Sequence, residues 1–372
     1  MRVLLVNAVC GSGSTGRICL EIARDFERQG TEVRIAYGRD DHVPADCRRL
    51  AVRIGGSVGV RAHALMTRLL DRHGTGLCSY FATRRFLKWA EAYNPDLLWL
   101  HNLHGYYINF ELLFRWIKSR PGMKVKWNIH DCWNFTGHCC HFQQTKCDRW
   151  LTGCYDCPEK GEYPKCIGFS NAKANWRAKR SAFLGVRDMT LITPSNWLAD
   201  LVRRGFLGAE YPVEVVRHPF DAETFRRTPS DVRKRLGLEG KFMVLCVASQ
   251  LDERKGVGDV IRLAGIMPED WRIVAVGLTK RQISTLPPRI IGMERTNSKR
   301  ELVELYSSAD VFFNPTQEDI YSMTNIEAAS CGCKVVTYDV GGAPEAIDWY
   351  ENKVVLKGRE MCPEGLIRSL CP

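Results

Sequence analysis

The sequence lacks the long apolar segments of membrane-spanning and exported proteins. No apolar run among its 372 residues reaches the roughly 18 residues that a membrane-spanning helix needs. The opening stretch MRVLLVNAV is too short for the apolar part of a secretory signal and is typical of a first β-strand. We therefore expect a cytoplasmic protein, whose 16 cysteines are free thiols or metal ligands rather than disulfides.

Acidic residues are scarce in one part of the chain. Between Arg48 and Lys88, nine lysines and arginines stand against Asp71 alone, in a chain whose net charge is +11. The stretch VGVRAHALMTRLL within this segment places apolar and basic residues at helical spacing, which is typical of helices on anionic membrane surfaces. A helix face in solvent explains the pattern equally well. Peripheral attachment to the inner face of the membrane and plain solvent exposure therefore both stay open.

Short apolar strands alternate with helices along the chain, and the pattern runs twice. The expected strands are VLLV, EVRIAY, DLLWL, KVKWNI and TLIT, then KFMVLCVAS, WRIVAVGL, DVFFN and KVVTY. Alternation of this kind predicts an α/β fold with parallel sheets covered by helices. We expect two Rossmann-like domains, residues 1–218 and 219–372, with their sheets facing across a ligand-binding cleft.

A glycine-rich turn follows the first expected strand. The pattern G-x-G-x-x-G and the acidic residues of a dinucleotide-binding domain are supplied by Gly11, Gly13, Gly16, Asp40 and Asp41. Residues 7–10 separate the strand from the first glycine, however, whereas a nicotinamide-binding fold turns at once. Because glycine turns before helices also bind other phosphates, we assign Gly13, Ser14 and Gly16 to a phosphate- or acceptor-binding loop.

The second half places cations and carboxylates at the ends of expected strands. Arg254 and Lys255 lie in SQLDERKGVGD, between a strand and a helix, and two cations beside a helix N-terminus suit a diphosphate. Asp319 and Glu327 lie eight residues apart in NPTQEDIYSMTNIEAASCG, where carboxylates suit sugar hydroxyls. We expect Glu327 in the first turn of the next helix, with the backbone N–H groups of residues 321–324 open to phosphate oxygens.

In this order, the motifs resemble family 4 glycosyltransferases of the GT-B fold. The resemblance rests on ERKG, on the acidic pair in EDIYSMTNIEAASCG and on GGAPEA, and it spans residues 4 to 345. Within this family, the chain most resembles a branch that acts in colanic-acid-type exopolysaccharide assembly. This narrower resemblance rests on four stretches of the first half: LHNLHGYYIN, IHDCWNFTGHC, GCYDCP and TPSNWLADLV. It implies a retaining hexosyltransferase that moves a sugar from a UDP- or GDP-sugar to a saccharide acceptor, lipid-linked, in bacterial polysaccharide assembly.

The resemblance also implies roles for the donor-site residues. Lys255 and Arg254 bind the donor diphosphate, Glu327 binds the ribose, and Asp319 binds the transferred sugar. Asp319 departs from the family's usual glutamate, and Ser249–Gln250 stands where the family commonly has Gly-Arg. The donor site is completed by the start of the following helix, at Tyr321, Ser322, Met323 and Thr324.

Three histidines follow the ends of two expected strands. His130 ends KVKWNI, and in the resembling family a histidine at this place touches the donor sugar near the reacting carbon. We therefore predict His130 and Asp319 as the catalytic residues, although a histidine that caps a loop is the alternative for His130. His101, Asn102 and His104 follow DLLWL and are assigned to the acceptor side, with simple packing as their alternative.

The motif Asp-x-Asp does not occur in the chain, so we expect no catalytic metal that bridges the donor diphosphate. Fixed cations and a helix N-terminus then stabilise the departing nucleoside diphosphate. The resemblance implies that the acceptor hydroxyl attacks from the same face, and that its proton passes to the leaving phosphate.

Seven of the cysteines lie between Cys132 and Cys166, in a loop with little helix or strand periodicity. The spacing C-x7-C-x6-C-x2-C, which ends in a recurrent zinc half-site, is formed by Cys139, Cys147, Cys154 and Cys157. We predict a structural zinc site there, because a loop without a core of its own gains folding free energy from the metal. His138 or His141 could replace one thiolate, and reduced cysteines packed without metal are the alternative.

Two other classes of protein use some of the same features. An NAD-dependent oxidoreductase with structural zinc would use the glycine turn and the cysteines, but it leaves Asp319 and Glu327 without a role. A nucleic-acid-binding zinc protein would use the positive charge and the cysteines, but it gives no role to two α/β domains. We therefore expect no nucleic acid partner.

Overall fold

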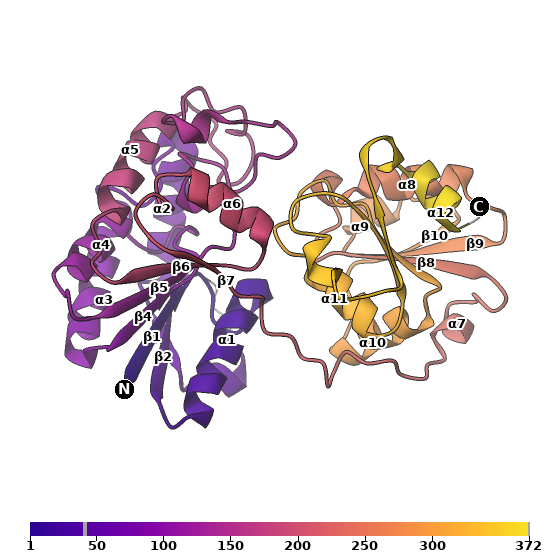
Figure 1. The fold of residues 1–372 in the computed structure, drawn as a ribbon, viewed down its shortest axis with the longest axis horizontal. Coiled ribbons are helices and arrows are strands. Elements are labelled where there is room, and N and C mark those ends of the chain that lie inside the picture. Colours follow the sequence, from indigo (N-terminus) through magenta and orange to yellow (C-terminus); the bar gives the residue numbers. More distant parts are fainter. Residues whose placement is uncertain (40–42, 371–372) are drawn as a thin grey trace. The chain divides into compact units, whose positions relative to one another are not determined.

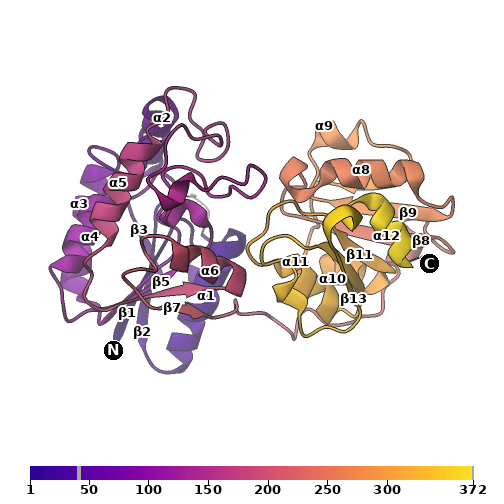
Figure 2. The same ribbon diagram turned by 45° about the horizontal axis from the view of Figure 1, so that its top comes forward.

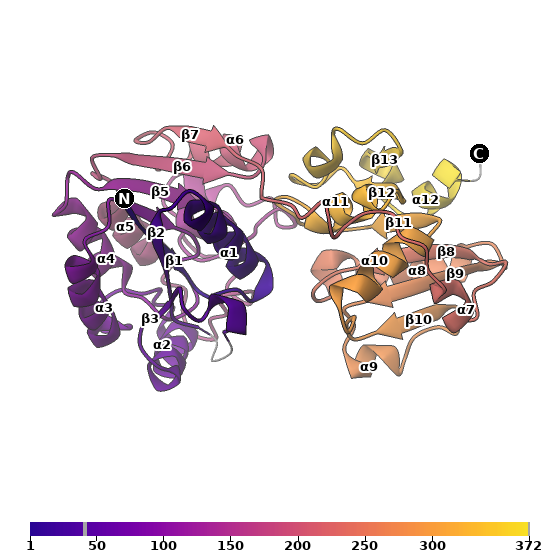
Figure 3. The same cartoon turned by 90° about the horizontal axis from the view of Figure 1, so that it is seen from below.

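The computed structural model describes residues 1–39 and 43–370 and divides into two compact units, Met1–Pro219 and Phe220–Pro372. Each unit is a parallel β-sheet with helices on both faces, as the views in Figures 1, 2 and 3 show. This arrangement confirms the predicted α/β class of two Rossmann-like domains. Asp40 and Asp41 of the dinucleotide pattern lie outside the described residues.

The N-terminal unit contains a seven-stranded sheet. Across the sheet the strands are β3 (Ala51–Arg53), β2 (Glu32–Tyr37), β1 (Arg2–Asn7), β4 (Leu97–Leu100), β5 (Lys124–Asn128), β6 (Met189–Thr193) and β7 (Val213–Val215). The helices are α1 (Gly13–Arg28), α2 (Ser57–Leu70), α3 (Tyr80–Tyr93), α4 (Phe110–Lys118), α5 (Ala172–Phe183) and α6 (Asn196–Arg204). Between β5 and α5 the cysteine-rich loop holds only the short 3-10 turns η2 (Cys132–Asn134) and η3 (Arg149–Leu151).

The C-terminal unit contains a six-stranded sheet. Across it the strands are β10 (Ile290–Met293), β9 (Trp271–Val276), β8 (Phe242–Val247), β11 (Val311–Asn314), β12 (Lys334–Tyr338) and β13 (Lys353–Leu356). The helices are α7 (Val232–Arg235), α8 (Val257–Ile266), α9 (Lys280–Ile283), α10 (Lys299–Ser308), α11 (Met323–Ser330) and α12 (Pro363–Leu370). A 3-10 turn, η4 (Glu253–Lys255), precedes α8.

Burial on both faces explains why the central strands are continuously apolar. In β8, Val244 packs in a core with α8 and α12, while the next residue, Leu245, packs in a second core with α10 and α11. Successive side chains of a strand point to opposite faces of the sheet, so a strand covered on both sides needs an apolar residue at every position. This pattern made the central strands visible in the sequence.

The order of strands reverses once in each sheet. The reversal lies between β1 and β4 in the first unit and between β8 and β11 in the second. Open parallel sheets bind ligands outside the carboxyl ends of the strands at such a point, because the connections diverge there and leave a crevice. A ligand-binding site is therefore expected in the loops after these four strands.

Among the described residues, no helix is long and apolar enough to cross a membrane.

Candidate functional site

Two loops of the C-terminal unit meet where its strand order reverses. Gly256, after β8, has φ of 80°, and a Cβ built on it would lie 2.2 Å from the carbonyl oxygen of Pro315, after β11. The backbone N–H of Gln317 donates to the Arg254 carbonyl at 2.9 Å. Only glycine allows both the left-handed backbone and this close approach. The sequence therefore fixes the two loops against each other.

Lys255 and Asp319 are brought together by this contact. The Lys255 Nζ lies 2.7 Å from Oδ2 of Asp319 and donates to the Glu318 carbonyl at 3.3 Å. Both side chains keep some contact with solvent, at 19% and 17% exposure. A partly desolvated ion pair is held more firmly than one on the open surface. The cation predicted for the diphosphate thus lies beside the carboxylate predicted for the sugar.

A buried polar network fixes the start of α11. The Nδ2 atom of Asn314, at the end of β11, donates to Ser322 Oγ at 2.9 Å and to Asn325 Oδ1 at 2.8 Å. Asn325 in turn donates to the Ala343 carbonyl at 3.0 Å, and the hydroxyls of Ser322 and Thr324 lie 3.2 Å apart. Neither Asn314 nor Asn325 was predicted from the sequence. The only sequence signal was the amide of Asn314 at the end of an apolar strand.

Two details of the predicted helix start are wrong. Because α11 begins at Met323, Glu327 is its fifth residue and lies in the second turn rather than the first. The backbone N–H of Tyr321 donates to Asp319 Oδ1 at 3.3 Å, so it is not open to a phosphate as predicted. Glu327 itself accepts a hydrogen bond from the buried hydroxyl of Tyr306 at 3.0 Å, and burial and this carboxylate raise the pKa of Tyr306.

An open groove follows the carboxyl ends of β8, β9 and β10. It contains the predicted donor residues Ser249 and Gln250 together with two cations from the neighbouring loops, Lys280 and Arg295. Gly277 lines it as well, and a Cβ there would lie 2.1 Å from the Ala248 carbonyl oxygen. Lys280 and Arg295, which sequence reasoning did not single out, supply positive charge near the position where the family's usual arginine is missing.

In the N-terminal unit, Asn7 connects the loops at the reversal of strand order. Its Nδ2 donates to the Val9 carbonyl at 2.9 Å and to Thr15 Oγ1 at 3.3 Å, and its Oδ1 accepts from the backbone N–H of Asn102 at 3.2 Å. The glycine-rich loop is thereby tied to the loop after β4. Gly13 and Ser14 are the first two residues of α1, and Gly16 lies two residues further on.

Three histidines form a stack beside these loops. His101 Nδ1 lies 2.9 Å from His130 Nε2, with the rings nearly parallel at 5.2 Å, and the His218 ring lies 5.3 Å from that of His130. Burial lowers the pKa of His101 to about 3 and that of His218 to about 4. Burial, with the neighbouring rings, also lowers the pKa of His130 well below its usual value. His130 is therefore neutral at physiological pH. Sequence reasoning missed His218.

His104 belongs to a different pair. Its Nε2 lies 2.7 Å from Asp131 Oδ2, and its Nδ1 lies 3.3 Å from the Tyr163 hydroxyl. Burial alone would raise the pKa of Asp131, but the His104 ring and the backbone N–H of Trp133 hold it below its usual value. Asp131 is thus an ionised carboxylate that orients His104. Sequence reasoning missed Asp131 even though it follows His130 directly.

Groups that could hold a metal occur only in the N-terminal unit among the described residues. Two groups bring three ligand atoms within 4.8 Å of one another: one is Asp71, His73 and His138, and the other is His104, Asp131 and Cys140. The four predicted zinc thiolates do not form such a group, although the thiols of Cys139 and Cys157 interact directly. The tetrathiolate zinc site stays a prediction.

The geometry at β8 and β11 agrees with what comparisons of the sequence show. Residues 230–368, almost all of the C-terminal unit, match the family of glycosyl transferases group 1. This part of the chain is similar to the group 1 glycosyl transferases. The chain is 30% identical over 158 residues to alpha-galactosylglucosyldiacylglycerol synthase of Streptococcus pneumoniae, an alignment that covers 40% of this chain and 39% of that protein. The chain thus spans about two fifths of the length of that curated relative. These matches liken part of the chain to known glycosyltransferases.

Solved structures extend the likeness to the fold of both units. Sucrose-phosphate synthase from Thermosynechococcus elongatus superposes with a TM-score of 0.68 at 13% identity, over 99% of this chain and 89% of that chain. HepE of Anabaena, solved in complex with UDP and glucose, superposes with a TM-score of 0.63 at 14% identity, over 100% of this chain and 89% of that chain. At such identities the likeness concerns the fold alone. The predicted GT-B fold of two Rossmann-like domains is confirmed.

Proposed function

We propose that this protein is a retaining glycosyltransferase that moves a hexose from a nucleotide-sugar to a saccharide acceptor. The observation that carries the proposal is the pairing of Lys255 with Asp319 at the strand reversal of the unit that matches the group 1 family. A diphosphate needs a cation, and a sugar hydroxyl needs a carboxylate acceptor. Here the two lie side by side at the place where parallel sheets bind ligands.

The donor site uses residues from three loops. Lys255 and Arg254 bind the diphosphate, and Asp319 binds hydroxyls of the transferred sugar. Glu327 binds the ribose, with its position fixed by the Tyr306 hydroxyl. The groove of Ser249, Gln250, Lys280 and Arg295 holds the rest of the nucleotide. HepE, which shares the fold, binds UDP and glucose, which supports a UDP-sugar as donor; a GDP-sugar is the other candidate.

The reaction proceeds on one face of the sugar. As the anomeric carbon–oxygen bond to the diphosphate breaks, the acceptor hydroxyl oxygen bonds to the same carbon, and its proton passes to the departing phosphate oxygen. Lys255 and Arg254 stabilise the negative charge that develops on the phosphate. His130 acts as a neutral hydrogen-bonding group near the sugar, since burial keeps it uncharged. In this scheme no divalent cation takes part.

The acceptor side has the charge expected for a phosphorylated lipid carrier. A groove beside α2 is lined by four cations, Arg39, Arg61, Arg68 and Lys165, together with Tyr106 and Tyr163. The Tyr163 hydroxyl touches His104, which connects this groove to the predicted acceptor residues. We assign the phosphates of a lipid-linked saccharide to this groove.

Exposed apolar side chains lie on α2 and on a loop bonded to it, and one of them, Leu65, lines the same groove. Leu65 and Leu69 on α2 are 56% and 47% exposed, and Phe169, from a loop bonded to the end of α2, is 93% exposed. Apolar residues beside arginines suit the surface of an anionic membrane, where a lipid-linked acceptor lies. We therefore place the enzyme at the inner face of the membrane, in bacterial exopolysaccharide assembly.

A screen of donors tests the proposal. UDP-, GDP- and ADP-sugars are added separately to the full chain and the melting temperature is followed, because a ligand that binds only the folded state raises it. We expect one nucleotide series to raise it, and the matching donor to be consumed when a lipid-diphosphate saccharide is supplied. Proton NMR of the product is expected to show the anomeric configuration of the donor. No shift with any nucleotide-sugar, or an inverted product, would contradict the proposal.

A further inference from the structure

Two histidines at the ends of neighbouring strands form a hydrogen-bonded pair in the N-terminal unit. The Nδ1 atom of His101 lies 2.9 Å from Nε2 of His130, and the planes of the two rings differ by 17°. The His101 side chain is fully buried, whereas His130 is partly exposed. His130 can therefore touch a ligand directly, and His101 can act on that ligand only through His130.

Three strands hold His101 in place. It follows β4, its backbone N–H donates to the Val6 carbonyl of β1 at 2.8 Å, and its own carbonyl accepts the indole N–H of Trp127 in β5 at 3.0 Å. The Trp99 ring lies nearly parallel to its imidazole, with centroids 6.4 Å apart. The position of the His101 Nδ1 atom is thus fixed by the core of the sheet.

The hydrogen bond between the two rings has two possible directions. A neutral imidazole carries one proton, on Nδ1 or on Nε2, so one ring donates and the other accepts. If His101 donates, its proton is on Nδ1, and His130 accepts at Nε2 and carries its own proton on Nδ1. If His130 donates, its Nδ1 is a bare acceptor and the proton of His101 is on Nε2. The two directions give His130 opposite roles toward a ligand.

The second nitrogen of His101 decides between the two directions. This atom, Nε2, is buried and has no hydrogen-bond partner within the described part of the chain. A proton on it would create a buried N–H without an acceptor, which is rare in proteins and rarer than a buried acceptor without a donor. His101 therefore carries its proton on Nδ1 and donates it to His130.

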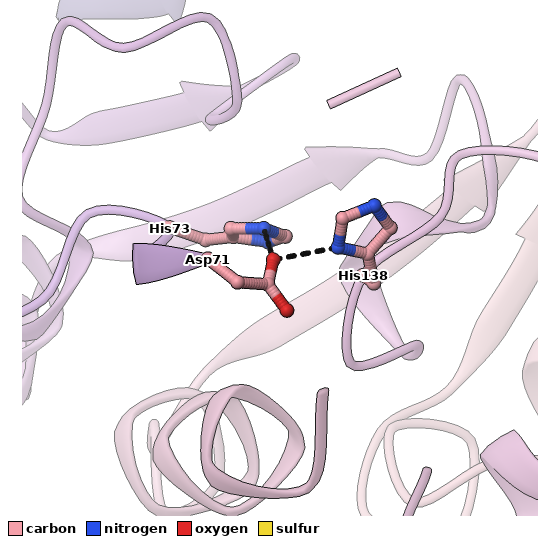
Figure 4. Close-up of side chains that lie close together, drawn as sticks. All are labelled: Asp71, His73 and His138. Atoms are coloured by element: carbon pink, nitrogen blue, oxygen red, sulfur yellow. Dashed lines mark hydrogen bonds and ion pairs between the residues drawn. The ribbon is translucent and has the colours of Figure 1, made fainter. Parts of the chain in front are cut away.

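A second pair of histidines in this unit is arranged differently. One oxygen of Asp71 lies between two rings, 2.8 Å from His73 Nε2 and 2.6 Å from His138 Nδ1 (Figure 4). Burial alone would raise the pKa of Asp71, but the bonds from His138 and His73 hold it below its usual value, so it is ionised. An ionised carboxylate only accepts, and it sets the proton of each ring separately.

No such carboxylate serves the first pair. Among the described residues, neither ring of His101 and His130 is bonded to a carboxylate, so the proton on one ring sets the tautomer of the other. The outer nitrogen of His130, Nδ1, has no hydrogen bond to any residue that the structure describes. The His218 ring packs against His130, with centroids 5.3 Å apart, and helps to hold the plane of its ring. His130 thus presents an N–H donor in a fixed direction.

We propose that His101 is a positioning residue of the transfer reaction, whose Nδ1–H fixes His130 in the tautomer that presents an Nδ1–H donor to an oxygen atom of the transferred sugar. The inference rests on the proposed function for the identity of the ligand, whereas the tautomers are properties of the protein alone. It replaces the direct acceptor contact predicted for His101, because a fully buried side chain does not reach the acceptor. A donor that is already oriented need not turn when the sugar binds, which favours catalysis.

Nitrogen NMR of the unaltered full chain measures both tautomers without any ligand. The chain is labelled with nitrogen-15 histidine, and correlations between the ring nitrogens and the carbon-bound ring protons distinguish Nδ1–H from Nε2–H. The two signals are assigned by their loss in His101→Asn and His130→Asn. We expect both rings in the Nδ1–H form at neutral pH. An Nε2–H form of either ring overturns the proposal, whatever reaction the protein catalyses.

Variants separate positioning from simple packing. His101→Asn keeps an N–H near the place of Nδ1, whereas His101→Phe removes it and keeps a buried ring. In His101→Phe we expect His130 to leave the Nδ1–H form and kcat to fall about 3- to 10-fold, the effect of one lost hydrogen bond, at nearly unchanged donor KM. His101→Asn should keep both the tautomer and most of kcat. The control is His63→Phe, which removes another buried histidine, bonded to Ser79 at 2.8 Å, and should change neither.

The outcomes distinguish this inference from the proposed function. An unchanged His130 spectrum or an unchanged kcat in His101→Phe overturns the positioning role, as does an equal loss of kcat in His63→Phe. If His101→Phe fails to fold, His101→Asn and the spectrum of the unaltered chain still decide. If the tautomers are as expected but the unaltered chain transfers no sugar from any donor, the proposed function has failed, and the role of His101 in it fails as well, while the pairing of the two rings stands.

Discussion

The Lys255 ammonium lies 2.7 Å from the Asp319 carboxylate, although 64 residues separate them in sequence. The contact exists because Gly256 lets the loop after β8 approach Pro315, at the start of the loop that carries Asp319. In the proposed enzyme, the groups for the diphosphate and for the sugar are therefore in place before the donor binds. Groups that are already positioned lose less freedom when the ligand arrives, which favours catalysis.

Replacing Lys255 tests its role in binding the diphosphate. We expect Lys255→Ala to weaken binding of the nucleoside diphosphate about 10- to 100-fold, the effect of losing one charge-assisted hydrogen bond, and to abolish transfer. Unfolding free energy should change by less than about 1 kcal/mol, because the pair is partly exposed. Calorimetry with UDP and GDP measures the first effect. Lys357→Ala, which removes a more exposed lysine near Asp339, is the control. Unchanged affinity in Lys255→Ala would place the diphosphate elsewhere.

The hydrogen bond between Tyr306 and Glu327 gives a graded test of the ribose site. Glu327→Gln removes the charge that accepts the ribose hydroxyls, and we expect transfer to be lost. Tyr306→Phe keeps that carboxylate but removes the hydroxyl that holds it, so we expect a rise in donor KM and a loss of about 1 kcal/mol in stability. Steady-state kinetics and urea unfolding measure the two effects. If both variants retain normal KM, Glu327 does not bind the donor.

Two glycines with similar backbone conformations allow the cost of backbone strain to be measured separately from the cost of breaking the contact between the two loops. Gly240 has φ of 70°, and a Cβ added there would meet nothing within 4 Å, whereas Gly256 has φ of 80° and the Pro315 oxygen at 2.2 Å from such a Cβ. Gly240→Ala should cost about 1 kcal/mol, from strain alone. Gly256→Ala should cost clearly more and also weaken nucleotide binding, because the loops of Lys255 and Asp319 must separate. Equal losses of stability with intact binding would show that the loop contact is dispensable.

The apolar side chains beside the basic groove are expected to bind membranes. Replacing Leu65 and Leu69 with serine should reduce the protein recovered with floating acidic vesicles at least several-fold, while neutral vesicles retain little of either protein. The matched control replaces Ile261 and Ile266, which are exposed on α8 to a similar degree, at 41% and 43%. Recovery that does not depend on acidic lipid, or equal recovery of both double variants, would mean that this face of α2 is only solvated.

Stability should fall in mild acid because of the buried histidines. Burial lowers the pKa of His101 to about 3, whereas an unfolded chain has a histidine pKa near 6.5, so the unfolded state binds more protons between these values. The stabilising effect is complete above about pH 6.5 and is lost as the pH falls toward 3. From pH 7 to pH 5 we expect a loss of about 2 kcal/mol from His101. Urea unfolding of His101→Gln should show a correspondingly flatter pH dependence; the same slope in both proteins would exclude this explanation.

Much of the fold was determined by the sequence alone. The nine predicted strands all occur, because a strand buried on both faces is a continuous apolar run in the sequence. The four strands that were missed, β3, β7, β10 and β13, are the edges of the two sheets, where three or four residues, most of them partly exposed, carry little pattern. The order of motifs along the chain also identified the glycosyltransferase resemblance.

Contacts between distant residues were decided only by the tertiary structure. Local sequence located Lys255 and Asp319 separately, but their pairing depends on how two loops pack. The start of α11, and hence the turn that carries Glu327, depends on the buried amide of Asn314, which the helix sequence does not contain. Cysteine spacing alone favoured four thiolates and gave no sign that His138 is paired with the buried carboxylate of Asp71, 67 residues away. Helix and strand patterns are local properties, but the partner of a polar group is fixed by the packing of segments far apart in the chain.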